Sequence, residues 1–127
     1  MAALPLRLYP GDDLRGAIET ALRGQGAAFV LQGIGSLSVA RLRLAGRPGA
    51  DELLGDMEIL TLAGSVSPDG AHLHMTVADS EGRVLGGHVA PGCIVRTTAE
   101  VLVALLPGHA FGRELDGATG YPELVIR

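Results

Sequence analysis

The chain has 127 residues, a formal net charge of −4 and four aromatic side chains, so we expect one domain over residues 1–127 with an aliphatic core. No apolar run approaches the roughly 20 residues of a membrane-spanning helix, and the single cysteine, Cys93, excludes an intrachain disulfide. The ten arginines are scattered, with 41–47 as the only local group, which disfavours nucleic-acid binding through a positive patch. The N-terminus lacks the pattern of a signal peptide, so a soluble cytoplasmic protein is expected.

The first predicted elements are a short strand over Leu4 to Tyr9 and an amphipathic helix over about residues 12–24. Asp12 is the expected N-cap of the helix, and Gly24 follows its last turn. The apolar face has the i, i+3, i+4, i+7, i+8 spacing of a helix, in Leu14, Ala17, Ile18, Ala21 and Leu22.

From Ala27 onward the apolar period changes to two, which predicts strands. Residues 27–46 form one or two strands with a glycine kink at 33–35, and 47–56 form a connecting loop. Three further strands are expected at 57–67, 71–79 and 83–90, separated by turns at 67–70 and 80–82.

The segment CIVRTTAEVLVALL at 93–106 is ambiguous. Thr97 and Glu100 have the spacing of a helical capping box, whereas three valines favour a strand. The tail over 111–127 predicts one or two short strands. One helix among antiparallel hairpins makes an α+β domain, mainly antiparallel β-sheet with the helix packed on it.

Three of the four histidines, His72, His74 and His88, lie within seventeen residues of this predicted sheet. A three-residue loop at 80–82, with Gly82 in the left-handed region, pairs Asp79 with residue 83 and therefore places His74 opposite His88. His72 then lies on the same face, diagonal to His88. Opposed Cβ atoms are roughly 4.5–5.5 Å apart and diagonal ones about 7–8 Å, so all three can reach one metal ion.

The preceding hairpin extends this register. With Pro68-Asp69-Gly70 as its loop, Ser67 pairs with Ala71, His74 faces Gly64, and Glu58 falls on the histidine face further along. The opposite face is predicted to be core and carries Leu73, Met75, Val77, Leu85 and Val89.

Three imidazoles suit zinc and leave one coordination position open for water or a ligand. We therefore predict a zinc site at His72, His74 and His88, with Glu58 as its possible neighbour. His109 follows Pro107-Gly108 in a predicted loop and is read as a surface residue. Cys93 is interpreted as a small core residue rather than a nucleophile.

Several stretches together resemble the plants-and-prokaryotes-conserved (PPC) domain. They are PGDDL at 10–14, GIGSLSVARLR at 33–43, GDMEILTLAGSVSPDGAHLHMTVADSEGRVLGGHV at 55–89, TAEV at 98–101 and ELDGATGYPEL at 114–124. The resemblance implies an α+β homotrimer, a strand at 93–106, and zinc on the histidines matching His72, His74 and His88. Stand-alone prokaryotic members are described as candidate DNA-binding proteins, which implies a DNA-linked regulatory role.

The acidic charge disfavours DNA as a partner, and so does the lack of an AT-hook, of which only the fragment Gly46-Arg47-Pro48 is present and is read as a turn. Two alternatives therefore stay open. One is a small-molecule-binding module whose ligand the sequence does not name. The other is a zinc-dependent enzyme in which the metal activates water and Glu58 acts as the base.

Overall fold

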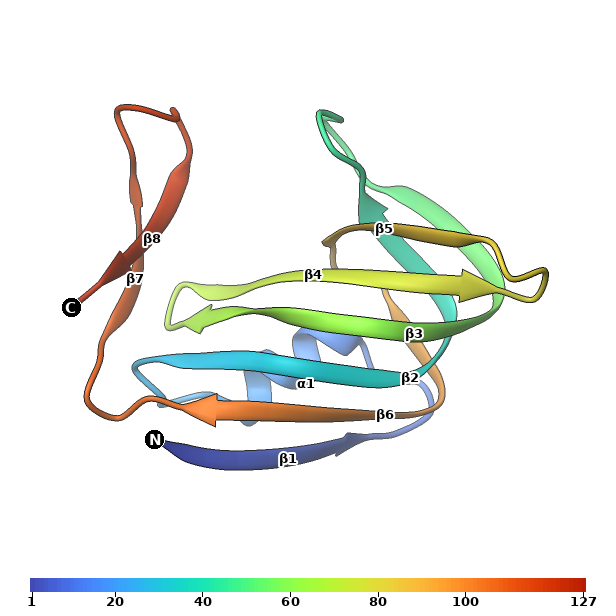
Figure 1. Ribbon diagram of the computed structural model, residues 1–127, viewed down its shortest axis with the longest axis horizontal. Coiled ribbons are helices and arrows are strands. Elements are labelled where there is room, and N and C mark those ends of the chain that lie inside the picture. Colours follow the sequence, from blue (N-terminus) through green and yellow to red (C-terminus); the bar gives the residue numbers. More distant parts are fainter.

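The computed structural model describes all residues from Met1 to Arg127. It confirms an α+β fold, mainly antiparallel sheet with one short helix (Figure 1). None of its helices has the length and hydropathy needed to cross a membrane. The elements in chain order are β1 (Ala2–Leu8), α1 (Leu14–Ala21), β2 (Ala28–Arg43), β3 (Asp51–Ser67), β4 (Gly70–Asp79), β5 (Val84–Val89), β6 (Ile94–Leu105), β7 (Phe111–Leu115) and β8 (Pro122–Ile126).

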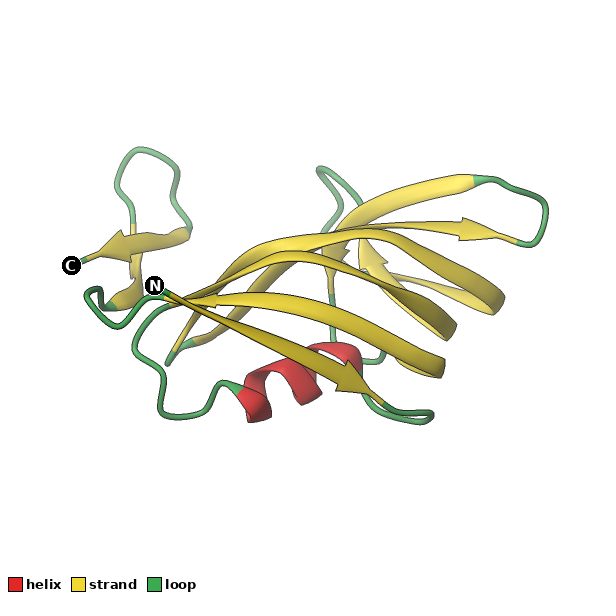
Figure 2. Ribbon diagram, turned by 60° about the horizontal axis from the view of Figure 1, so that its bottom comes forward, coloured by secondary structure: helices red, strands yellow, loops and turns green.

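Six strands form one antiparallel sheet in the order β1-β6-β2-β3-β4-β5. The end of β2 also pairs with the end of β5, through Leu42 with Val89 and Arg43 with His88, so strands β2 to β5 close on themselves. Helix α1 covers one face of the sheet, and β7 and β8 form a separate two-stranded sheet at one end (Figure 2).

The helix begins one residue later than predicted at its N-cap. The carboxylate of Asp13, not that of Asp12, accepts a hydrogen bond from the Gly16 N–H at 2.8 Å. The backbone of Asp12 instead accepts a hydrogen bond from Val95 N–H, and its side chain accepts one from Tyr9 N–H. Asp13 therefore ties the start of the helix down, and its second oxygen also accepts the Gly92 N–H.

The prediction of a connecting loop at 47–56 was wrong in its second half. Strand β3 begins at Asp51 and runs for 17 residues. Its first four residues, 51–54, pair with residues 39–42 of β2. The two strands project together beyond the helix-covered part of the sheet (Figure 1). The turn predicted around Gly46-Arg47-Pro48 is present between them.

The ambiguous segment at 93–106 is a strand, β6, which lies between the edge strand β1 and β2. The strand wins over the helix that the capping-box spacing favours, because β6 pairs with β1 on one side and with β2 on the other. The tail forms two short strands, as expected.

The core lies between α1 and the sheet and is aliphatic, as the composition predicts. Leu73, Met75, Val77 and Val89 are buried in it, which confirms the predicted core face. Leu85 was also predicted to be buried but is 45% exposed, because β5 pairs with β2 only at its far end and leaves Leu85 without a covering strand. The largest fully buried side chains are Leu14, Ile18, Leu37, Leu42, Leu62, Leu73 and Met75.

Candidate metal centre

The hairpin between β4 and β5 has the register predicted from its loop. The Asp79 N–H donates to the Arg83 carbonyl, and Gly82 has a φ of 79°, the left-handed conformation that the three-residue loop requires. His74 therefore pairs directly with His88 across the two strands. His72 lies two residues before His74 on β4, and its side chain is on the same face of the sheet as those of His74 and His88.

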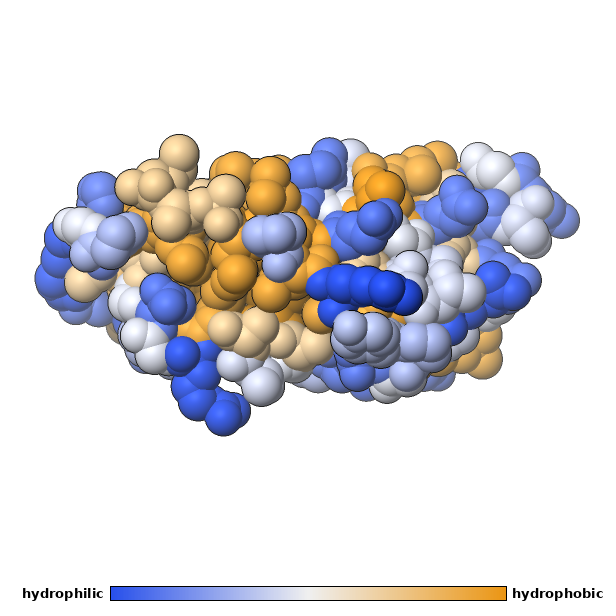
Figure 3. Space-filling model, turned by 90° about the horizontal axis from the view of Figure 1, so that it is seen from below, coloured by the Kyte–Doolittle hydropathy of each residue, from blue (hydrophilic) through white to orange (hydrophobic).

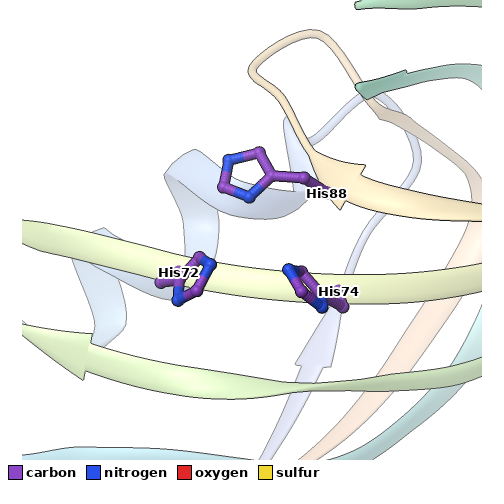
Figure 4. Close-up of side chains that lie close together, drawn as sticks. All are labelled: His72, His74 and His88. Carbon is purple, nitrogen blue, oxygen red and sulfur yellow. The ribbon is translucent and has the colours of Figure 1, made fainter. Parts of the chain in front are cut away.

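The three imidazoles surround a common space (Figure 4). One ligand atom from each of His72, His74 and His88 can be chosen so that all three lie within 4.8 Å of one another. The ring centroids are separated by 5.0 Å for His72 and His74, 5.3 Å for His72 and His88, and 5.9 Å for His74 and His88. The rings are not stacked, because their interplanar angles are 85° for His72 and His74, 38° for His72 and His88, and 70° for His74 and His88.

One atom of the cluster has no hydrogen-bond partner. His88 Nδ1 is buried and is the only buried side-chain nitrogen or oxygen in the chain without one. An unpartnered buried polar atom costs about 1–3 kcal/mol, which a metal–nitrogen bond would offset. Nitrogens on one tetrahedral zinc lie roughly 3.3 Å apart, so small side-chain rotations bring this cluster to that spacing. The residues present thus fit a three-histidine zinc ion with one open position.

The surroundings of His72 and His88 lower the pKa of both side chains. Burial, and then the positive charge of Arg113, lowers the pKa of His72. Burial and the positive charge of Arg43 lower the pKa of His88 from 6.5 to about 4. Both rings are therefore unprotonated at pH 7, which is the form that binds metal.

The hairpin before β4 differs from its predicted register by one residue. Its loop has two residues, Pro68 and Asp69, so Ser67 pairs with Gly70 and His74 faces Ala63 rather than Gly64. Gly64 instead pairs with Leu73, and a Cβ at Gly64 would run into the backbone carbonyl of His72. The glycine thus permits close backbone contact and does not clear space above His74.

Glu58 shares the histidine face but is not brought together with the cluster. A bulge in β3 between Ile59 and Thr61 sets Glu58 opposite Ala78, four residues along β4 from His74. At about 3.3 Å per residue this is roughly 13 Å of strand. Its side chain is exposed.

Two other sequence interpretations agree with the structure. His109 lies in an exposed loop. Cys93 is fully buried, its Sγ accepts the Arg41 N–H at 3.2 Å, and burial raises the pKa of the thiol. A buried thiol of raised pKa is a poor nucleophile, in keeping with a core residue.

Sequence reasoning missed three arginines beside the histidines. Arg15, Arg43 and Arg113 line the same cleft as His72 and His88. They come from α1, β2 and β7, nearly one hundred residues apart at the extremes, and no local spacing joins them. Only the closure of β2 onto β5 and the docking of the C-terminal hairpin bring them together.

The fold and the cluster define a single-helix, antiparallel β-sheet domain that presents three convergent histidines. The chain belongs to the Plants and Prokaryotes Conserved (PCC) domain family, whose model matches residues 1–107. The match confirms the resemblance drawn from the sequence. The β7-β8 hairpin lies beyond the matched residues.

Solved structures of similar proteins share this fold. A hypothetical protein from Salmonella cholerae-suis is 37% identical, with a TM-score of 0.96 over 99% of this chain and 93% of that one. A metal-containing protein from Archaeoglobus fulgidus is 31% identical, with a TM-score of 0.84 over 98% and 94%. A protein from Ralstonia eutropha, named as a candidate DNA-binding protein, is 25% identical, with a TM-score of 0.81 over 97% and 90%.

A curated relative is much longer than this chain. The bifunctional protein GlmU of Synechococcus sp. (strain JA-2-3B'a(2-13)) is 53% identical over 126 residues, which cover 97% of this chain. The chain spans about one fifth of that protein's length. The likeness is therefore to one part of a larger protein.

Proposed function

We propose that this domain is a metal-binding module that holds one zinc ion on His72, His74 and His88. The carrying observation is the convergence of three imidazoles around one space, with the buried Nδ1 of His88 lacking any other partner. The metal-containing relative from Archaeoglobus fulgidus supports the same reading. Bound zinc would act as a Lewis acid at its open position, and the protein's residues would orient whatever occupies that position.

Metal analysis tests this proposal. Protein purified without added metal, then loaded with zinc and desalted, should contain about one zinc per chain by atomic emission. The variant with His72, His74 and His88 all changed to Ala should contain none. His109→Ala is the matched control, because this histidine is exposed in a distant loop and its loss should change nothing. Wild-type protein that retains no zinc after loading would refute the metal site.

The assembly that we propose is a homotrimer, as the family resemblance implies. Its support is the sheet face opposite α1, which the β7-β8 hairpin contacts at one end only and which exposes large apolar side chains. Apolar side chains also gather over the β1 edge (Figure 3). Exposed apolar side chains that gather in one patch mark protein interfaces. The exposed apolar residues of this face are Phe29, Leu31, Ile34, Leu60 and Leu102. Light scattering on the purified protein should give three times the 13.0 kDa of one chain.

A DNA-linked regulatory role is the second candidate. The name of the Ralstonia eutropha relative supports it, whereas the net charge of −4 opposes it. DNA binding driven by phosphate contacts weakens steeply as salt rises, because counterions are released. A gel-shift titration between 50 and 200 mM salt, roughly the range in which such binding falls by about 10³ to 10⁵, separates the two readings. Binding that is absent or insensitive to salt removes this candidate.

A further inference from the structure

Three arginines from separate elements meet beside the three histidines. Arg15 of α1, Arg43 of β2 and Arg113 of β7 line one cleft of about 600 Å³, together with His72 and His88. We call it the arginine cleft.

The backbone fixes each arginine in this position. Arg43 pairs directly with His88 across β2 and β5, so their side chains emerge on the same face. Arg113 donates through its Nη2 to Ser65 Oγ at 2.8 Å, and Ser65 is the β3 partner of His72.

Arg15 reaches the cleft around the open edge of β4. Strand β5 ends at Val89, so β4 has no neighbour on that side along residues 70–73. The Nη1 of Arg15 lies 3.5 Å from the Val89 carbonyl, next to His88 in the chain.

The arginine charges are largely unneutralised. Neither Arg43 nor Arg113 has a carboxylate within ion-pair distance, and Arg15 has only Glu19 at 3.5 Å. Arg43 and Arg113 are thus two guanidinium groups in the cleft without an ion-pair partner.

Two carboxylates also line the cleft. They are Asp69 and Glu123, and one Asp69 oxygen already accepts the Arg113 backbone N–H at 2.9 Å. With Arg15 paired to Glu19, Arg43 and Arg113 face Asp69 and Glu123, and a divalent ion on the imidazoles would add two positive charges.

We propose that the arginine cleft binds a small oxyanion, a carboxylate or phosphate group of a small molecule, which takes the open position of the metal. This inference rests on the proposed zinc site. Guanidinium groups match the planar or tetrahedral oxygens of such anions with paired N–H donors. A cleft of this volume lies within the roughly 300–1,000 Å³ of small-molecule sites, and Arg113, Pro122 and Glu123 of the β7-β8 hairpin form part of its wall.

Cobalt substitution gives a direct measurement of the open position. Protein loaded with Co²⁺ is titrated separately with inorganic phosphate and with succinate, and the visible ligand-field spectrum is followed. We expect a saturable spectral change with at least one of the two anions, and the tighter one identifies the source of the oxyanion. Neutral glycerol should produce no change.

Variants test whether the arginines hold the anion. Replacing Arg43 or Arg113 by Gln should weaken anion binding about 10-fold each, the effect of one charge-assisted hydrogen bond. Arg96→Gln is the matched control, because Arg96 is paired with Asp56 and lines no part of the cleft. Metal content and far-ultraviolet circular dichroism are measured on every variant, so that misfolding is not mistaken for a lost contact.

The outcomes separate this inference from the zinc site itself. Wild-type protein without bound metal would defeat the proposed function. Normal metal content with no spectral response to either anion would overturn the oxyanion site alone. Equal anion binding by Arg43→Gln, Arg113→Gln and the Arg96→Gln control would overturn it as well, and so would tighter binding of a duplex oligonucleotide than of either small anion.

Discussion

His74 and His88 lie directly opposite each other on β4 and β5, with ring centroids 5.9 Å apart. Their meeting depends on one loop, because a shift of a single residue in a strand moves every side chain to the other face. Gly82 in the left-handed conformation fixes a three-residue loop and thereby the register. A local turn thus decides whether His88 joins His72 and His74 on one face or points to the other face.

The closure of β2 onto β5 should be sensitive to Gly87. A Cβ at this position would lie 2.8 Å from the Arg43 carbonyl oxygen, a backbone atom that cannot move without shifting the strand. We expect Gly87→Ala to lower the free energy of unfolding by about 1–3 kcal/mol, as overpacking does, and to weaken zinc binding because His88 is displaced. Urea denaturation and competition with a zinc chelator measure both effects. Gly108→Ala is the control, since nothing lies within 4 Å of its Cβ position; an equal effect there would contradict the explanation.

The sequence could predict those parts of the site that depend on residues close together in the chain. The loop around Gly82 is local, so the pairing of His74 with His88 was predictable and is confirmed. The Pro68-Asp69 turn is equally local, but Pro-Asp-Gly is compatible with loops of two or three residues, and the register of β3 was missed by one. The pairing of Arg43 with His88 joins residues 45 apart through the curvature of the whole sheet, and no local pattern indicates it.

The two adjacent aspartates at the helix start should differ in their effect on stability. Asp13 accepts hydrogen bonds from Gly16 N–H and Gly92 N–H, whereas the Asp12 side chain accepts only the Tyr9 N–H at an exposed position. Asp13→Ala should therefore lower the free energy of unfolding by about 2 kcal/mol and Asp12→Ala by about 0.5 kcal/mol. Thermal and urea denaturation of the two variants check this order. A larger loss in Asp12→Ala would show that the N-cap lies at Asp12.

Acid should destabilise the metal-free protein through His88. Burial, the charges of Arg43 and Arg15, and the neighbouring His72 and His74 lower its pKa from 6.5 to about 4. The unfolded chain therefore binds this proton more readily than the folded one, and stability falls as the pH decreases from about 6.5 to 4.

Urea denaturation of chelator-treated protein across this pH range measures the loss. Carboxylates also titrate in its lower part, so the informative quantity is the difference between wild type and His88→Gln. The variant should lose less stability between pH 6.5 and pH 4. Parallel curves for the two proteins would show that protonation of His88 is not coupled to unfolding.

The exposed sheet face should control assembly. Ile34 of β2 is 49% exposed on the sheet face opposite α1, and a carboxylate there would be buried without a partner in a trimer. Ile34→Glu should convert the homotrimer to species near the 13.0 kDa of one chain, measured by light scattering. Leu115→Glu is the control, because Leu115 is 76% exposed on the β7-β8 hairpin, away from this face. The helix and the core do not involve Ile34, so its variant should keep the circular dichroism of the wild type. A trimer that survives Ile34→Glu but not Leu115→Glu would place the interface on the hairpin instead.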